Sequence, residues 1–171
     1  MNNSVAFKLL QAIVSGTVLP LIGDEIFCAA FVGKVYSKGR PRFGKGHAFT
    51  PKNTRDFEKS VKNWLIGECG EPVDFPCAVE IVLYDPIPKS APRWLRMYLE
   101  SEVVFSKVGD IDNRAKAILD AANELIFTDD SLVVDLHVRR HYGPVGGFKM
   151  TVRRAGVSAA ELDVLRRVGG K

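Results

Sequence analysis

The chain has 171 residues and a formal net charge of +4, with 46% hydrophobic and 26% charged residues. These proportions are those of an ordinary globular protein of about one domain, which can bury a core without disulfides or a structural metal. No stretch reaches the roughly 18 apolar residues of a membrane span, which excludes a membrane protein. No basic segment precedes the N-terminal apolar stretch, which argues against a signal peptide. We therefore expect a cytoplasmic protein.

The three cysteines, Cys28, Cys69 and Cys77, are an odd number, and their spacing matches no zinc site. Cys28 and Cys77 lie in apolar runs, so we expect buried, reduced thiols.

The N-terminal third predicts a helix, a strand and an arm. Residues 1–22 have the pattern of an amphipathic helix followed by a turn at Pro20, and residues 25–32 that of a short strand. Residues 34–53 are rich in Gly, Pro and bases, which predicts a loop or an irregular extended arm.

The middle of the chain predicts helix, strand and short helix. A helix is expected over residues 54–66, capped by Asn53 or Thr54. Its apolar residues keep a helical period: Phe57, Val61, Trp64 and Leu65. Residues 77–84 form the clearest strand pattern of the sequence, and residues 93–102 predict a short helix after a proline-rich loop.

The last part predicts a helix over residues 112–125, a strand over 132–142 and a returning hairpin strand over 148–154. The helix has one apolar stripe, made of Ile111, Ala115, Ile118, Leu119, Ala122 and Leu125. Ser158 and Glu161 form a capping box that opens a final short helix. The order of elements indicates a single α+β domain.

Charge is distributed unevenly along the chain. Residues 100–135 contain nine acidic and three basic side chains, which leaves −6 in that segment and +10 in the rest. An acidic segment in an otherwise basic chain is typical of an enzyme that holds cations in one place and phosphates around it.

The acidic segment contains two close pairs. Asp110 and Asp112 stand two residues apart, where the extended lead-in over residues 103–108 turns into a helix. Side chains two apart on an extended backbone point the same way, so both carboxylates can face one cavity. Asp129 and Asp130 follow the helix, and they join the first pair only if the chain returns beside it.

Carboxylates packed together repel one another unless a cation lies between them. Oxygen ligands without nearby His or Cys favour Mg²⁺ or Mn²⁺, which can bridge carboxylates and phosphodiester oxygens and help to ionise water. Lys116, one helical turn after Asp112, can bind the scissile phosphate. Spacing alone leaves three alternatives open. Asp112 can be a helix cap, Lys116 its salt-bridge partner, and Asp129-Asp130 a turn.

The combination resembles the RusA family of Holliday junction resolvases. The matching residues are Asp110-x-Asp112-Asn113-x-x-Lys116, a helix ending in Leu125-Ile126-Phe127, and then Asp129-Asp130-Ser131. The arm over residues 38–58 is also similar to that family, so that the resemblance covers residues 25–154.

This resemblance implies a small mixed β-sheet with helices packed on it, in β-α-β-α-β-β order. It implies a domain over residues 25–155, with an N-terminal extension over 1–24 and a C-terminal helix and tail over 156–171. It further implies a bacterial or phage-encoded homodimer that needs Mg²⁺, with Mn²⁺ able to substitute. Such enzymes cut four-way DNA junctions by paired symmetric nicks during recombination and repair.

By position in the family motif, Asp110, Asp112 and Asp130 would be the catalytic metal ligands, with Lys116 as the catalytic lysine. Asn113 would orient Asp112 or the backbone, and Asp129 ranks second to Asp130. The chain departs from the family at Arg114, where a leucine-like residue is common, and we expect this arginine to place a second base near the metal site.

Two basic segments are candidates for DNA binding. The first interleaves bases with aromatic residues, which suits branched or unpaired DNA: Lys38, Arg40, Arg42, Lys45, His47 and Lys52, with Tyr36, Phe43 and Phe49. The second includes Arg139 and Arg140, with Arg153 and Arg154 on the next strand, although alternate strand positions face solvent in any case. His137 and His141 are expected to face DNA or to be structural, and not to bind metal.

Two other functions remain open from the sequence. One is a related structure-specific nuclease for flaps or forks, and the other is a catalytically silent DNA-binding protein on the same scaffold.

Overall fold

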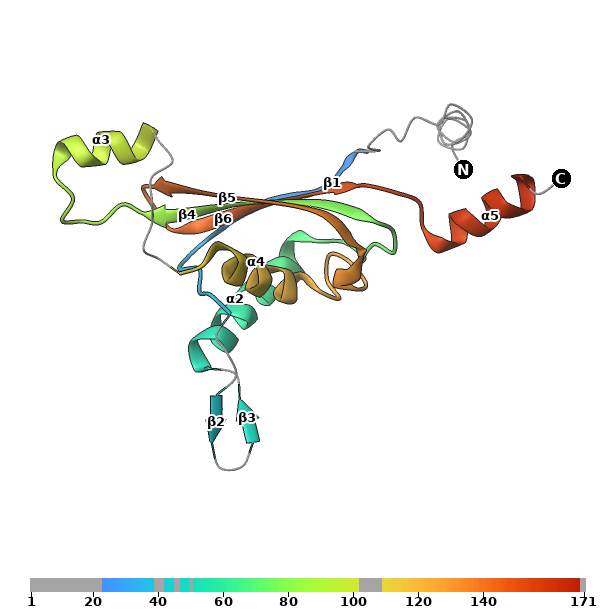
Figure 1. The fold of residues 1–171 in the computed structure, drawn as a ribbon, viewed down its shortest axis with the longest axis horizontal. Coiled ribbons are helices and arrows are strands. Elements are labelled where there is room, and N and C mark those ends of the chain that lie inside the picture. The colour runs from blue at the N-terminus through green and yellow to red at the C-terminus, as the bar shows by residue number, and fades with distance from the viewer. Residues whose placement is uncertain (1–22, 39–41, 45–46, 50, 102–108, 170–171) are drawn as a thin grey trace.

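The computed structural model describes residues 23–38, 42–44, 47–49, 51–101 and 109–169. In this part of the chain, four strands form one mixed sheet in the order β1-β6-β4-β5. They are β1 (Glu25–Val32), β4 (Cys77–Pro86), β5 (Val133–Gly143) and β6 (Gly147–Arg154). Helices α2 (Lys52–Glu68) and α4 (Ile111–Ala122) lie on one face of this sheet (Figure 1). The predicted α+β class with a mixed sheet is confirmed.

Strand β4 is the centre of the core. Its side chains alternate, and Cys77, Val79, Ile81 and Leu83 are buried against the two helices. Helix α2 buries Phe57, Val61 and Leu65 on this face, and α4 buries mainly small residues and Ile118. Burying one such large apolar side chain contributes roughly 1.5–3 kcal/mol to the stability of the fold. The apolar layer between β4 and the two helices therefore fixes both helices on the sheet.

The predicted hairpin between the last two strands is wrong. Strand β5 pairs in parallel with β4, and β6 lies on the other side of β4, antiparallel to both β4 and β1. The turn over residues 144–146 therefore passes over the end of β4. The inner position suits β6, whose Phe148, Met150 and Val152 are buried, whereas β5 has four consecutive exposed residues.

Three local predictions need correction. The arm contains a small antiparallel hairpin, β2 (Arg42–Gly44) and β3 (His47–Phe49), which projects from the start of α2 (Figure 1). Helix α2 begins two residues early, with Pro51 as its N-cap, so that neither Asn53 nor Thr54 caps it. Helix α4 ends at Ala122, because the C-cap residue Asn123 has an extended backbone, and Glu124 then turns the chain with φ +65°.

Helix α3 (Arg93–Ser101) and the final helix α5 (Ala159–Gly169) were both expected. The capping box of α5 is confirmed. The Ser158 backbone amide donates to Glu161 (2.8 Å), and the Glu161 amide donates to Ser158 Oγ (3.2 Å). A short 3-10 helix, η1 (Asp130–Leu132), precedes β5. The helix and strand expected over residues 1–22 and 103–108 lie outside the described residues.

The three cysteines are free thiols. Cys77 is buried as expected, but Cys28 is exposed, because β1 is an edge strand and the face that carries Cys28 is uncovered. Burial raises the pKa of the Cys77 thiol, against the opposing effect of Arg154. Within the described residues, no helix is long and apolar enough to span a membrane.

Candidate active site

Asp110 and Asp112 lie exposed at the start of helix α4. Asp110 is the N-cap residue, with extended backbone angles, and Asp112 is in the first turn. The expectation that both stand on an extended backbone is therefore wrong, since the helix begins between them at Ile111. The Asn113 side-chain amide donates to Asp110 Oδ2 (3.3 Å), so Asn113 orients Asp110 and not Asp112.

Gly109 sets the direction in which the chain enters this helix. Its φ is +61°, a conformation that L side chains rarely adopt, and a Cβ there would collide with Ser37 Oγ. The carbonyl oxygen of Gly109 accepts a hydrogen bond from Arg140 Nη2 on β5 (2.8 Å). Gly109, the residue immediately before Asp110, is thus fixed by two contacts, the close approach to Ser37 and the hydrogen bond from Arg140.

A buried network of charged side chains supports the position of Gly109 and Asp110 from the interior of the protein. Asp85, at the end of β4, is 1% exposed and accepts a hydrogen bond from Arg114 of α4 (2.7 Å), whose side chain is 2% exposed. The second Asp85 oxygen lies 3.5 Å from Arg140 Nε. Burial lowers the pKa of the Arg114 guanidinium, and the neighbouring Asp85 charge opposes this shift.

This network corrects one prediction. Arg114 does not add a base to the metal site, because its guanidinium points into the protein toward Asp85. Arg140 joins Asp85 to the Gly109 carbonyl, and its role in DNA binding stays a prediction. Both arginines act on the position of the acidic motif.

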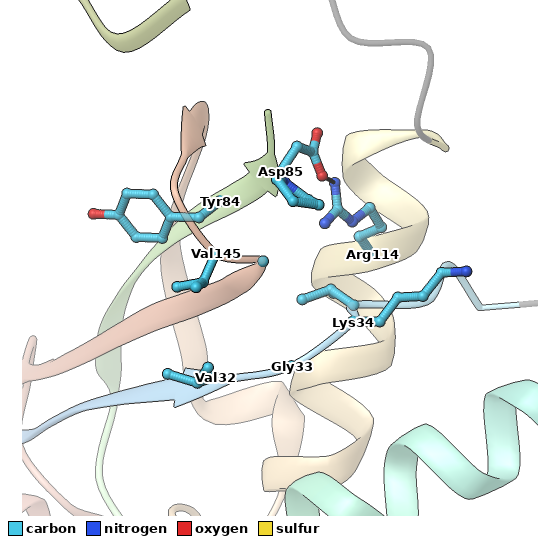
Figure 2. A pocket seen from close by; sticks show the side chains of 10 residues that line it. Val32, Gly33, Lys34, Tyr84, Asp85, Arg114 and Val145 are labelled. Carbon is cyan, nitrogen blue, oxygen red and sulfur yellow. Dashed lines mark hydrogen bonds and ion pairs between the residues drawn. The ribbon is translucent and has the colours of Figure 1, made fainter. Parts of the chain in front are cut away.

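A pocket of about 550 Å³ lies beside this network (Figure 2). It is formed where β1 and β4 end and by the turn before β6, and Asp85 and Arg114 line it together with Lys34. Most of the other lining side chains are aliphatic, including Val32 and Val145. The lining of this pocket is therefore mostly apolar, with charged side chains at one end.

Asp129 and Asp130 lie at the opposite end of α4. Helix α4 has 12 residues and is about 18 Å long at about 1.5 Å per residue. After it, the amide of Thr128 donates to the Val73 carbonyl (2.9 Å), which holds this loop near the beginning of β4. Gly109, in contrast, is held near the end of β5. Within the described residues of one chain, no group of three His, Cys, Asp or Glu is placed to hold a metal.

The two later carboxylates differ in their surroundings. Asp129 caps the short helix η1, and its carboxylate accepts from the Ser131 amide (2.8 Å). The hydrogen bond with the Ser131 side chain, followed by the one with its backbone amide, lowers the pKa of Asp129. Asp130 is exposed on the first residue of η1. The ranking of Asp130 over Asp129 as a ligand, which the family resemblance implies, stays a prediction.

Two of the structural alternatives for the motif are not observed. The N-cap of α4 is Asp110 and not Asp112, and its side chain makes no capping hydrogen bond. Lys116 is exposed, and among the described residues it forms no ion pair with Asp112. Mg²⁺ commonly binds one or two protein carboxylates and completes its shell with water and phosphate oxygens. The donor set at Asp110 and Asp112 fits such an ion.

The predicted DNA-binding residues differ in their placement. Lys38 runs beside α4, where its amide donates to the Asn113 carbonyl (2.9 Å) and its ammonium pairs with Asp120. Arg42 lies on β2, and Lys52 is exposed at the first position of α2. Arg40 and Lys45 lie outside the described residues.

In the second basic patch, each described arginine has an acidic neighbour. Arg139 is exposed and pairs with Glu80, and Arg153 lies 3.5 Å from Glu25. Arg154 pairs with Glu161 and also stacks over the Phe75 ring at 4.2 Å. This patch carries little unpaired positive charge, so the arm is the better candidate for phosphate contacts.

Sequence reasoning missed Asp85 and Gly109. A signal for Asp85 was available, because it continues the inward register of Cys77, Val79, Ile81 and Leu83. An acid in that register must find a buried partner. Gly109 had no comparable signal, since its positive φ follows from tertiary packing.

Comparison with known proteins agrees with this picture. The family described as Endodeoxyribonuclease RusA matches residues 33–153. A curated protein of Bacillus subtilis (strain 168), named "Uncharacterized protein YqaN", is 30% identical over 131 residues. That match covers 71% of this chain and 91% of the relative.

Proposed function

Since the chain belongs to the RusA family of endodeoxyribonucleases, we propose that it is a Mg²⁺-dependent resolvase of four-way DNA junctions. It would cut by paired symmetric nicks, with Mn²⁺ able to replace Mg²⁺. The observation that carries this proposal is the acidic start of α4. Two exposed carboxylates stand there, on a backbone that Gly109, Arg140 and Asp85 hold in place.

Asp110 and Asp112 would hold the metal, and Asn113 would keep the Asp110 carboxylate oriented by its 3.3 Å hydrogen bond. When bound, the ion supplies charge neutralisation at the phosphodiester and lowers the pKa of a coordinated water. In the reaction a water oxygen bonds to phosphorus while one backbone phosphorus–oxygen bond breaks. Lys116, exposed one turn after Asp112, would bind a phosphate oxygen and offset its growing negative charge.

The position of the basic arm supports a DNA substrate. Lys38 contacts α4 at Asn113, so the arm leaves the fold directly beside the acidic motif. The β2–β3 hairpin projects well beyond the helices (Figure 1). A basic arm that starts beside the reactive carboxylates and ends in a projecting hairpin can follow a phosphate backbone that leaves the cut site.

The test is Asp110→Asn, assayed on a four-way junction with Mg²⁺. This change preserves size and removes one anionic ligand, so we expect cleavage to fall at least about 100-fold while junction binding by gel shift is retained. Asp56→Asn, on an exposed position of α2, is the matched control and should leave cleavage unchanged. Full Mg²⁺-dependent cleavage by Asp110→Asn would refute the metal assignment.

A further inference from the structure

Helix α3 presents three large side chains to solvent. Trp94 is 70% exposed, Met97 63% and Tyr98 53%. Helical positions i, i+3 and i+4 lie on one face, so these side chains form one continuous group, which we call the α3 patch. Single exposed apolar residues are common, whereas a contiguous exposed group of this kind marks a surface that binds something.

The helix that carries the α3 patch is held in place. Leu99 is buried, and α3 contacts strand β5. The Arg96 guanidinium donates to the carbonyl oxygens of Ala91 (2.8 Å) and Lys89, which ties the preceding loop to the helix. A surface on a fixed backbone loses little conformational entropy when it binds a partner.

The surroundings of the α3 patch are basic. Residues 87–99 contain three bases and no acid. Lys89 and Arg93 are exposed, and among the described residues neither forms an ion pair. The arginines of the second basic patch, in contrast, each have an acidic neighbour. Exposed aromatic rings beside unpaired positive charge suit a polyanion that also presents flat apolar faces, which is a nucleic acid.

The α3 patch stands at the end of the sheet that holds the acidic motif. The Ile87 amide, just after β4, donates to the Gly143 carbonyl at the end of β5 (3.1 Å). At this same end, Arg140 of β5 donates to the Gly109 carbonyl next to Asp110 (2.8 Å). Figure 1 shows α3 and the beginning of α4 at this end of the sheet. DNA that is bound at the acidic motif therefore passes near α3, and this step rests on the proposed function.

Branched DNA offers aromatic rings a contact that linear duplex lacks. Inside a continuous duplex each base pair stacks on two neighbours, whereas the last pair of an arm at a branch point can lose one neighbour and expose its face. Aromatic side chains stack on such faces with little regard to sequence. We propose that Trp94 and Tyr98 stack on bases exposed at the branch point, while Lys89 and Arg93 contact the adjoining phosphates.

The stacking contact is tested first by fluorescence, without cleavage. The chain has two tryptophans. Trp64 packs against Phe31 (5.6 Å) and Phe148 (5.7 Å), so quenching by DNA reports Trp94. In the presence of a chelator, a four-way junction should quench the emission strongly and linear duplex of the same sequence only weakly. Trp94→Phe should lose this quenching and keep its junction affinity within about 3-fold, since the phenyl ring still stacks.

Binding by variants then separates stacking from charge. Trp94→Ala should weaken junction binding about 5- to 100-fold and change duplex binding by less than about 2-fold. Ile66→Ala, which removes a 64% exposed apolar side chain from α2, is the matched control and should change neither. Arg93→Gln should weaken binding of both DNAs by a similar factor and reduce its salt dependence, because phosphates are common to both.

The outcomes separate this inference from the proposed function. Equal weakening of junction and duplex by Trp94→Ala would overturn the stacking contact. Unquenched emission on the junction, with Trp94→Ala binding as wild type does, would also overturn it and would favour a protein partner for the α3 patch. A wild type that binds but never cuts DNA refutes the function, while the fluorescence still decides the contact. A wild type that cuts junctions without any effect of Trp94→Ala on binding refutes the inference and leaves the function standing.

Discussion

Asp85 is the buried residue on which the geometry around Asp110 depends. It accepts a hydrogen bond from Arg114 and lies 3.5 Å from Arg140, and its own exposure is 1%. Removing one partner of a buried ion pair leaves an uncompensated charge, which costs much more than the pair itself contributes. Asp85 is thus both a stability element and a positioning residue for Gly109 and Asp110.

We expect Asp85→Asn to lower the free energy of unfolding by about 3–5 kcal/mol. Urea denaturation followed by fluorescence measures this change. Glu80→Gln is the control, because its carboxylate pairs with exposed Arg139 and should contribute no more than about 1 kcal/mol. Equal losses from the two variants would contradict the structural role assigned to Asp85.

At the scale of elements, α5 is fixed mainly by its capping box and by Arg154. The hydrogen bond from the Ser158 amide lowers the pKa of Glu161, and Arg154 adds to this shift. A carboxyl group whose pKa is lower in the folded state stabilises that state above its unfolded pKa. The stabilisation is lost as the pH falls through the ordinary value of 4.5 toward the folded value.

Ser158→Ala should therefore weaken α5 by about 1 kcal/mol at neutral pH. Amide hydrogen exchange over residues 159–169, expressed as protection factors, measures this loss. Glu161→Gln should also reduce protection at pH 7, and its difference from wild type should shrink once the pH is well below 4.5. A difference that does not change with pH would show that the Glu161 charge has no part in the cap.

The elements also show what sequence patterns can and cannot predict. Local periodicity predicted β1, β4, β5 and α2, because each places its apolar residues on one face. It could not predict that β6 inserts between β1 and β4, since strand partners are chosen by contacts between residues far apart in the chain. The glycines after residue 142 suggested a hairpin between β5 and β6. No local sequence feature distinguishes such a hairpin from a connection that crosses over one intervening strand.

The candidate site, like the fold, could be predicted from the sequence only in part. Asp110, Asp112 and Lys116 were recognisable by residue type and spacing, and the structure exposes all three. The supporting network was not recognised, because Arg114 and Arg140 were interpreted as surface bases. Their partner Asp85 lies 29 residues from Arg114 in sequence, so only the folded sheet brings the two together.

At the scale of the whole molecule, the fold places its functional parts around α4. The acidic motif and the buried network stand at the beginning of this helix, and the basic arm starts beside it. Asp130 stands at the far end, next to the open edge of β5. Within one chain, α4 therefore separates Asp130 from Asp110 and Asp112.

The most direct measurement of the central claim is cleavage of a four-way DNA junction and of linear duplex with the same sequence. Wild type is compared with Asp112→Asn, with Mg²⁺ and after chelation. We expect wild type with Mg²⁺ to nick the junction at least about 100-fold faster than the duplex, and Asp112→Asn to bind the junction without cutting it. Equal cleavage of junction and duplex, or undiminished cleavage by Asp112→Asn, would contradict the account.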